Sequence, residues 1–424
     1  MSGGTGEGGE PGSDRRSRSL TRGLLSLYAA VALRQPWIHR PATRNRRSSP
    51  VSVAAQHRAT GPDHANGCWP AGNRNLYAAH SIRCSRRLQG DAMTLAVSLP
   101  VAGLPPRETP ELVQAAARWG YRSAWASEVA GPDFASLLGA VAIASDVDLG
   151  VAVAPAQTRA PWLLAATAAS LSHLSEGRFS LGVGTSSEII VARWSGLDFD
   201  HPLDRLRETV EALRPLLDGE KVDYEGRFVH VRGARIFAPP PTRVPLLLGA
   251  LNPRSLRQAG GLADGVCLNQ LGPEHLPAVL DEVAAGARAV GRVPADLAVV
   301  ARLFCWVTDD PEGAREQLRR TFAPYAAVDA YNRFFEWLGF EEEAAGVREA
   351  MAARDREAAA RAVSDRMLDS IAAVGDADRV AARVRAYLDG GVTTAAIACP
   401  SPDPGDARAT LEAVGTRLGP SPTK

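Results

Sequence analysis

The chain has 424 residues, of which 45% are apolar and 22% charged, with a formal net charge of +1 at pH 7. These values are those of a soluble globular protein and exclude a chain dominated by one sign of charge. The charge is nevertheless uneven. Residues 1–92 carry fourteen arginines, no lysine and five acidic residues, a net charge of +9, whereas the rest carries 34 basic and 42 acidic residues, a net charge of −8.

The basic first part, residues 1–92, is rich in Gly, Ser and Pro and shows no sustained periodicity. Its one apolar run, residues 23–33, is bounded by arginines and is too short to span a bilayer. A signal or transit segment stays open, and a basic tail could contact nucleic acid or a membrane surface. We expect a disordered extension upstream of a native start at Met93, because an alternating strand pattern begins directly after that methionine.

The cysteines form no recognisable framework. The sequence has no Cys-x-x-Cys pair and no close pairing of cysteine with histidine, so neither a zinc site nor a set of disulfides is indicated. Three of them lie inside apolar runs, where buried structural thiols are common, and the pattern fits a reducing cytoplasm. The cysteines are Cys68, Cys84, Cys267, Cys305 and Cys399.

Residues 93–424 alternate short apolar runs with longer stretches of helical periodicity, such as 108–119 and 160–174. This alternation is typical of parallel βα units. Eight strands joined by helices predict an α/β fold, a (β/α)8 TIM barrel, over residues 93–424. The expected strands span residues 94–99, 123–126, 148–154, 178–183, 245–249, 264–268, 297–307 and 394–399.

Two insertions account for the length beyond that of an ordinary barrel, which is about 250 residues. The first, residues 188–244, follows the fourth strand and contains a helix near 204–217 and an alternating hairpin pattern over 221–233. The second, residues 311–372, follows the seventh strand and has a wholly helical pattern. We expect this second insertion to form a helical cap or an oligomer surface.

The stretch SEGRFSLGVGTSS, residues 175–187, ends the fourth strand. One interpretation is that Gly182 and Gly184 only allow a tight turn. The other is that small residues let backbone N–H groups approach an anion, with hydroxyl donors completing a phosphate site. Because the active face of a barrel lies at the carboxyl ends of its strands, this stretch would face the site. The hydroxyl residues are Thr185, Ser186 and Ser187.

A second candidate anion loop, GALNPRSLR at 249–257, follows the fifth strand. Asn252 can cap a helix whose first residue is Pro253. The free N–H groups and partial positive charge of that helix would point at the barrel mouth, with Arg254 and Arg257 in its first turns. A well-formed helix start is the simpler interpretation of this loop alone. Two such loops at one barrel face favour a phosphorylated cofactor or substrate.

Several longer segments resemble the luciferase-like monooxygenase superfamily. They include WASEVAGPDF, LSEGRFSLGVGTSS, VARWSGLDFDHP and LLLGALNPRSLRQAGGLADG. Within the superfamily the chain is most similar to oxidoreductases that use the deazaflavin coenzyme F-420 and, more loosely, to methylenetetrahydromethanopterin reductase. The resemblance begins at about Met93 and implies the same (β/α)8 barrel that the strand count predicts.

The resemblance also implies where a coenzyme binds. It would lie across the carboxyl face of the barrel, with its phosphate held by the two glycine-containing loops. Similar members have a bulge with a non-prolyl cis peptide at the end of the third strand, behind the coenzyme ring, and the matching step here is Ala152-Val153. The implied cofactor-binding residues are Ala152, Val153, Ala154, Gly182, Gly184, Thr185, Ser186, Gly249, Ala250, Leu251, Asn252, Pro253 and Arg254.

One departure from the family pattern concerns the reacting centre. Related deazaflavin enzymes commonly carry Asp-His after the second strand, whereas this chain has Glu128-Val129. Glu128 is therefore the catalytic candidate, as a proton donor or as an acceptor that anchors the coenzyme ring. An ion pair between Glu128 and a barrel arginine is the equal alternative.

Side chains just beyond the third and fourth strands are candidates for the substrate wall. Arginines there would face the acidic tail of the coenzyme, and indoles would form an apolar surface. Trp162 could equally belong to the core. The candidates are Arg159, Trp162, Arg193 and Trp194.

With the resemblance, these residues predict an oxidoreductase that moves a hydride between C5 of coenzyme F-420 and a small organic substrate. The cofactor carries such chemistry, and the protein orients the ring against the substrate. One alternative is an FMN-dependent luciferase-like monooxygenase. Another is a barrel that binds the coenzyme without catalysis, which the absence of the family histidine would favour. We expect a cytoplasmic homodimer with a small-molecule substrate, no metal, and no nucleic-acid or membrane partner.

Overall fold

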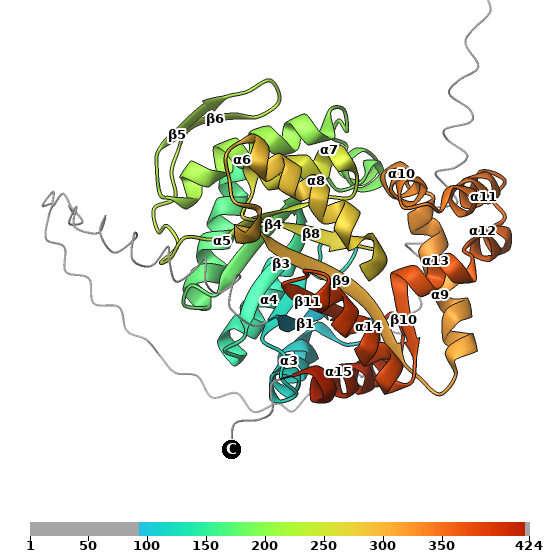
Figure 1. Cartoon of the computed structure of the whole chain (residues 1–424). Helices are drawn as coiled ribbons and strands as arrows, with labels where there is room; N and C mark the ends of the chain where they lie inside the picture. The colour runs from blue at the N-terminus through green and yellow to red at the C-terminus, as the bar shows by residue number, and fades with distance from the viewer. Residues whose placement is uncertain (1–92, 420–424) are drawn as a thin grey trace, which may run out of the picture.

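The computed structural model describes residues 93–419, so the predicted N-terminal extension and its apolar run lie outside the described residues. Eight parallel strands form a closed barrel surrounded by helices (Figure 1), which confirms the predicted TIM barrel. The barrel strands are β1 (Thr94–Leu99), β2 (Ser123–Ala126), β3 (Asp148–Pro155), β4 (Phe179–Gly184), β7 (Leu246–Gly249), β8 (Gly265–Asn269), β9 (Ala298–Val307) and β11 (Thr394–Ala398).

The barrel strands follow one another in chain order, and the pairings of β1 with β11 and of β8 with β9 close the ring. A further parallel strand, β10 (Ala372–Gly375), pairs with the end of the long strand β9 at Phe304–Val307, outside the ring. The sequence analysis did not predict β10. Its four small or apolar residues carry too little local signal, and pairing with β9 decides their conformation.

Alternate side chains of the strands face opposite sides of the barrel wall and form two cores. The larger core lies between the strands and the outer helices. The smaller core fills the barrel interior, where Trp125 packs with Ala96, Leu247 and Val300. Room for the indole comes from Gly150, because a Cβ there would lie 2.5 Å from the Trp125 ring.

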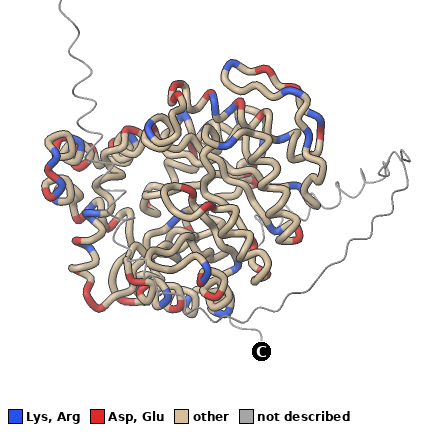
Figure 2. The backbone as a smooth tube through the Cα atoms, turned by 180° about the vertical axis from the view of Figure 1, so that it is seen from behind, with Lys and Arg blue, Asp and Glu red and all other residues tan. Residues whose placement is uncertain are grey.

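Helices form the outer layer, and charged residues lie mainly on these helices and on the loops (Figure 2). The helices expected at 108–119 and 160–174 are present as α3 and α5. The layer contains α3 (Thr109–Arg118), α4 (Phe134–Ala144), α5 (Pro161–Leu174), α6 (Pro202–Leu217), α7 (Pro253–Leu262), α8 (Leu276–Ala289), α14 (Ala377–Asp389) and α15 (Pro404–Leu418), with short 3-10 turns at Pro106–Glu108, Pro273–His275 and Pro294–Asp296.

The first insertion contains a π-helical turn (Ile189–Trp194), helix α6 and the predicted hairpin, formed by β5 (Val222–Glu225) and β6 (His230–Ala234). Glu208 of α6 is only 3% exposed. Its carboxylate accepts hydrogen bonds of 2.7 to 3.1 Å from three consecutive backbone amides at the turn of the hairpin, those of residues 227–229. These charge-assisted bonds fix the hairpin to the helix.

The second insertion is helical up to Ile371, so its helical part ends one residue before the predicted limit at residue 372, which belongs to β10. Its helices gather at one side of the barrel (Figure 1). They are α9 (Pro311–Ala326), α10 (Asp329–Trp337), α11 (Glu341–Ala352), α12 (Arg356–Ala362) and α13 (Asp365–Ile371).

Two features of residues 93–419 bear on the class of protein. None of their helices combines the length and the apolar character needed to cross a membrane. No three His, Cys, Asp or Glu side chains in this range come close enough together to hold a metal ion. Cys267 and Cys305 are buried free thiols, as their apolar surroundings in the sequence predict, and Cys399 is partly buried.

Candidate active site

A cleft of about 970 Å³ opens where the carboxyl ends of the barrel strands meet. This volume is at the upper end of the range for small-molecule sites, about 300–1,000 Å³. Both predicted anion loops contribute to its wall. The sequence-predicted residues that line it are Glu128, Ala152, Val153, Gly184, Thr185, Ser186, Arg193, Gly249, Ala250, Leu251, Asn252 and Arg254.

The remaining predicted residues do not line the cleft. Ala154 is buried in the outer core, Gly182 is enclosed by neighbouring strands, and Pro253 begins α7. Trp162 is neither a core residue nor part of the cleft, since it is 53% exposed on α5. The other two residues outside the cleft lining are Arg159 and Trp194.

The floor of the cleft includes a bulge in β3. Its pairing with β4 changes register between Val151 and Ala154. The intervening Ala152-Val153 peptide is cis, which confirms the prediction made from the resemblance. Val153 thereby lies at the cleft floor.

Three glycines of the neighbouring strands make room for this bulge. A Cβ on Gly184 would lie 2.5 Å from Cγ2 of Val153, and one on Gly249 would lie 3.1 Å from Cγ1 of the same residue. A Cβ on Gly182 would lie 2.2 Å from the carbonyl oxygen of Val151. Packing against β3 therefore requires glycine at 182 and 184 and leaves little room at 249, and none of the three has a positive φ that a tight turn would need.

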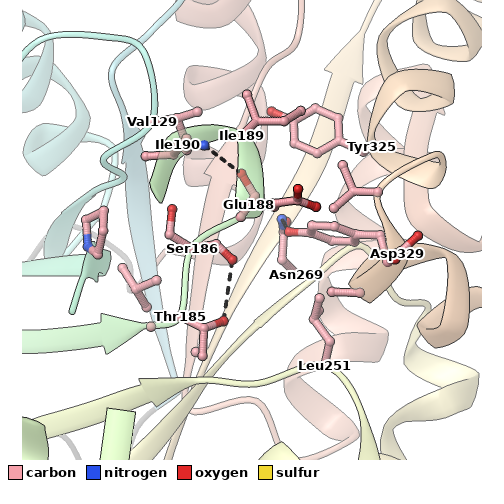
Figure 3. A pocket seen from close by; sticks show the side chains of 18 of the residues that line it. Val129, Thr185, Ser186, Glu188, Ile189, Ile190, Leu251, Asn269, Tyr325 and Asp329 are labelled. Carbon is pink, nitrogen blue, oxygen red and sulfur yellow. Dashed lines mark hydrogen bonds between the residues drawn. The ribbon is translucent and has the colours of Figure 1, made fainter. Parts of the chain in front are cut away.

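The loop after β4 presents hydroxyl groups to the cleft. Ser186 has a φ of 62°, in the left-handed region that non-glycine residues seldom adopt. Such turns aim successive backbone N–H groups toward one point and form anion sites. Figure 3 shows Thr185 and Ser186 here, with Glu188 and Ile189 on the following helical turn and Tyr325 and Asp329 across the cleft.

The loop after β7 leads into the N-terminus of α7. The Oγ of Ser255 accepts hydrogen bonds from the amides of Leu251 and Asn252, at 3.2 and 3.1 Å. The side-chain amide of Asn252 donates to the carbonyl of Ala330 in α10, at 3.2 Å. Asn252 thus ties this loop to the second insertion, in addition to its predicted place at the helix start.

Glu128 forms the ion pair that the sequence analysis held as the equal alternative. Its partner is Arg159, whose Nε donates to the carboxylate at 2.9 Å and whose terminal nitrogen makes a second, shorter bond. Arg159 also contacts Asp133 and lies over the ring of Phe134. The hydrogen bond to Glu128 raises the pKa of Arg159. A carboxylate held in this way is a hydrogen-bond acceptor, and the adjacent Val129 offers no proton.

The barrel interior supplies cleft residues that the sequence analysis missed. Arg302 of β9 donates from Nε to the hydroxyl of Ser98 in β1, at 3.2 Å. The amide of Asn269 donates to the hydroxyl oxygen of Tyr331, at 2.9 Å. Burial raises the pKa of Tyr331 to about 12, so its hydroxyl keeps its proton at neutral pH. The sequence did contain one indication of this site, because Arg302 is a charged residue inside the apolar run LAVVARLFCWV.

The second insertion forms one wall of the cleft and contributes arginines to its lining. The lining contains seven arginines but three acidic residues, one of which is Glu128 in its ion pair. Two of these arginines pair with acidic residues outside the lining, Arg254 with Asp204 and Arg348 with Glu336. Arginines still outnumber acidic residues in the cleft, in contrast to the net charge of −8 over residues 93–424, and this favours anionic ligands. The seven are Arg193, Arg254, Arg302, Arg333, Arg348, Arg354 and Arg356.

The chain is similar in sequence and in structure to known proteins. Methylenetetrahydromethanopterin reductase of Archaeoglobus fulgidus is 28% identical over 279 residues, which cover 65% of this chain and 82% of the relative. The enzyme of that name from Methanolobus tindarius is 30% identical over 251 residues, covering 59% and 76%. The structure of the coenzyme F-420-dependent tetrahydromethanopterin reductase of Methanopyrus kandleri has a TM-score of 0.66 at 25% identity, covering 77% of this chain and 98% of that one.

The sequence model of a whole family matches as well. It covers residues 86–394, from just before β1 to the start of β11, and is described as luciferase-like monooxygenase. The match therefore includes the β3 bulge, both loops and the second insertion. The chain belongs to the luciferase-like monooxygenase family.

Proposed function

We propose that the protein is an oxidoreductase that uses coenzyme F-420 and transfers a hydride between C5 of its deazaflavin ring and a small organic substrate. The observation that carries this proposal is the excess of arginines around a cleft that also contains two candidate anion loops. Coenzyme F-420 bears a phosphate followed by glutamate carboxylates, whereas FMN bears a phosphate alone. The relatives named as methylenetetrahydromethanopterin reductases and the F-420-dependent neighbour support the same choice.

The residues of the cleft fit such a coenzyme. The left-handed turn at Ser186 offers backbone N–H groups and hydroxyls for a phosphate, and the partial positive charge at the start of α7 favours an anion beside it. The bulge at Val153 offers an apolar support for a flat ring. The volume of the cleft accommodates a ligand of the size of the coenzyme. When bound, the coenzyme supplies the hydride chemistry.

The chain's own part is to bind, orient and exclude water. Trp125 and Val300 make the cleft floor apolar, and Arg159 holds the carboxyl group of Glu128 in place beyond the end of β2. Val129 stands where related deazaflavin enzymes commonly have a histidine. Tyr331 keeps its proton and its hydroxyl is available to donate to a substrate oxygen.

Binding to the full-length chain tests the choice of coenzyme. Coenzyme F-420 and FMN are titrated separately while the fluorescence of Trp125 and the other tryptophans is followed. We expect F-420 to bind at least about ten-fold more tightly, because one extra charge-assisted hydrogen bond contributes about 1.5–3 kcal/mol. Preference for FMN would support an oxygen-using monooxygenase, and binding of neither would overturn the proposal.

A matched pair of variants tests the arginine wall. Arg333 of α10 lines the cleft, whereas Arg320 of α9 is not among the lining residues and pairs with Glu316. Arg333→Gln should weaken binding of F-420 and leave FMN within two-fold, and Arg320→Gln should change neither. Equal effects of the two substitutions would contradict a role for the wall.

Turnover separates an enzyme from a carrier. Steady oxidation of reduced F-420, followed by absorbance with a panel of small carbonyl and imine acceptors, is the expected result. Tight binding without consumption across the panel would instead support a coenzyme-binding barrel. Assembly as a homodimer is part of the same proposal, and light scattering of the purified chain measures it.

A further inference from the structure

Arg302 differs from the other arginines of the cleft in its position. It lies on β9, inside the ring of barrel strands, whereas the others come from helices and loops around the mouth. Its neighbours in the barrel interior and cleft floor are apolar or neutral, among them Trp125, Val300 and Ala396. A cation in such surroundings loses part of its hydration and is stabilised chiefly by an anionic partner.

The described part of the chain supplies no such partner. Arg302 donates from Nε to the hydroxyl of Ser98, and its guanidinium lies 4.8 Å from the ring centre of Phe304. No carboxylate of residues 93–419 forms an ion pair with it. Glu128 is paired with Arg159, and no ion pair joins Arg302 to the other acidic residues of the described cleft lining, Glu188 and Asp329.

The hydrogen bond to Ser98 also sets how the guanidinium can bind. With Nε engaged, the two terminal nitrogens remain for a ligand, and two parallel N–H groups match the oxygens of a carboxylate. Asn269 is the register partner of Arg302 on β8 and binds the hydroxyl oxygen of Tyr331. Tyr331 therefore brings a further O–H donor to the same part of the floor.

We propose that Arg302 binds a carboxylate of the substrate, so that the substrate of this protein is a small organic acid. The proposal rests on the proposed function for its reaction, but the binding that it predicts is a property of the floor itself. Arg302 holds the acid in place by two hydrogen bonds, and Ser98 keeps the guanidinium turned toward the cleft. The surrounding apolar floor favours an acid with a flat or apolar body.

Benzoate and benzamide are suitable probes, because they share size and shape and differ in charge. Their binding to the full-length chain, loaded with F-420 and coenzyme-free, is measured by tryptophan fluorescence and calorimetry. We expect benzoate to bind at least ten-fold more tightly than benzamide. Arg302→Met should reduce that preference to less than two-fold, and Arg302→Lys, which keeps the charge without the paired N–H groups, should give an intermediate value.

Controls keep the outcomes apart. Arg320→Met, outside the cleft, should retain the benzoate preference, and thermal melting verifies that the Arg302 variants fold. Equal binding of the two probes to the unchanged chain, or a preference that survives in Arg302→Met, would overturn the proposal. If Arg302→Met loses F-420 binding but keeps the preference for benzoate, the proposal is also overturned, and Arg302 is assigned to coenzyme binding. The proposed function fails on a different measurement, namely if the unsubstituted chain does not bind F-420.

Discussion

The contact between Gly184 and Val153 gives the sharpest test of how the cleft floor is built. A Cβ on Gly184 would lie 2.5 Å from Cγ2 of Val153, whereas carbon atoms in contact are normally about 3.5–4.0 Å apart. Val153 has little room to withdraw toward β7, where a Cβ on Gly249 would lie only 3.1 Å from its Cγ1. Gly184→Ala must therefore displace Val153 or the loop that follows β4 by about 1 Å.

The expected cost follows from this overlap. Overpacking of this kind lowers the free energy of unfolding by about 1–3 kcal/mol. If the proposed function is correct, displacing Thr185 and Ser186 should also remove at least one charge-assisted hydrogen bond to the coenzyme phosphate, which corresponds to about ten-fold weaker binding of F-420. Both quantities are measurable, the first by denaturant titration and the second by fluorescence.

A second substitution isolates the contact. Val153→Ala removes both Cγ atoms, so the double variant Gly184→Ala/Val153→Ala should recover part of the stability and affinity lost in Gly184→Ala alone. Gly139→Ala in α4 is the control, because its Cβ would meet nothing closer than 3.8 Å. Strictly additive effects of the two changes, or unchanged F-420 affinity in Gly184→Ala, would refute the reasoning.

Two further predictions concern carboxylates. Burial raises the pKa of Glu208, but the hairpin amides that donate to it outweigh this and hold its pKa below the usual value. Its stabilisation should therefore be complete above the unfolded-state pKa of about 4.3 and be lost as the pH falls through the lower folded-state value. Thermal melting over a pH series should show a smaller loss of stability at acid pH in Glu208→Gln than in the unchanged chain, because other carboxylates with lowered pKa values, such as Asp264, remain. Arg159→Met should leave the carboxylate of Glu128 unpaired and cost about 1–3 kcal/mol by denaturant titration, less than for a fully buried pair. Adding Glu128→Gln should restore much of that, and no recovery would contradict the ion-pair account.

The sequence by itself determined the barrel and the place of its active face. Apolar runs such as TLAVSL and helical stretches such as 160–174 are local patterns, and their alternation leaves few topologies for eight parallel strands. The two loops could be assigned to one face for the same reason, because the carboxyl ends of parallel strands meet there. The cis step at Ala152-Val153 was available only through the resemblance, since neither residue marks it by type.

The tertiary structure alone decided what most of these residues contact. Gly184 and Gly249 meet Val153 only because β4 and β7 lie beside the bulge of β3, and Glu128 meets Arg159 across 31 residues of chain. The second insertion became a wall of the cleft through contacts such as Asn252 with Ala330, 78 residues apart. The periodicity of apolar residues along the sequence indicates which side of a helix or strand is buried. Which side chains meet across the barrel depends on how the ring closes, and no local pattern carries that information.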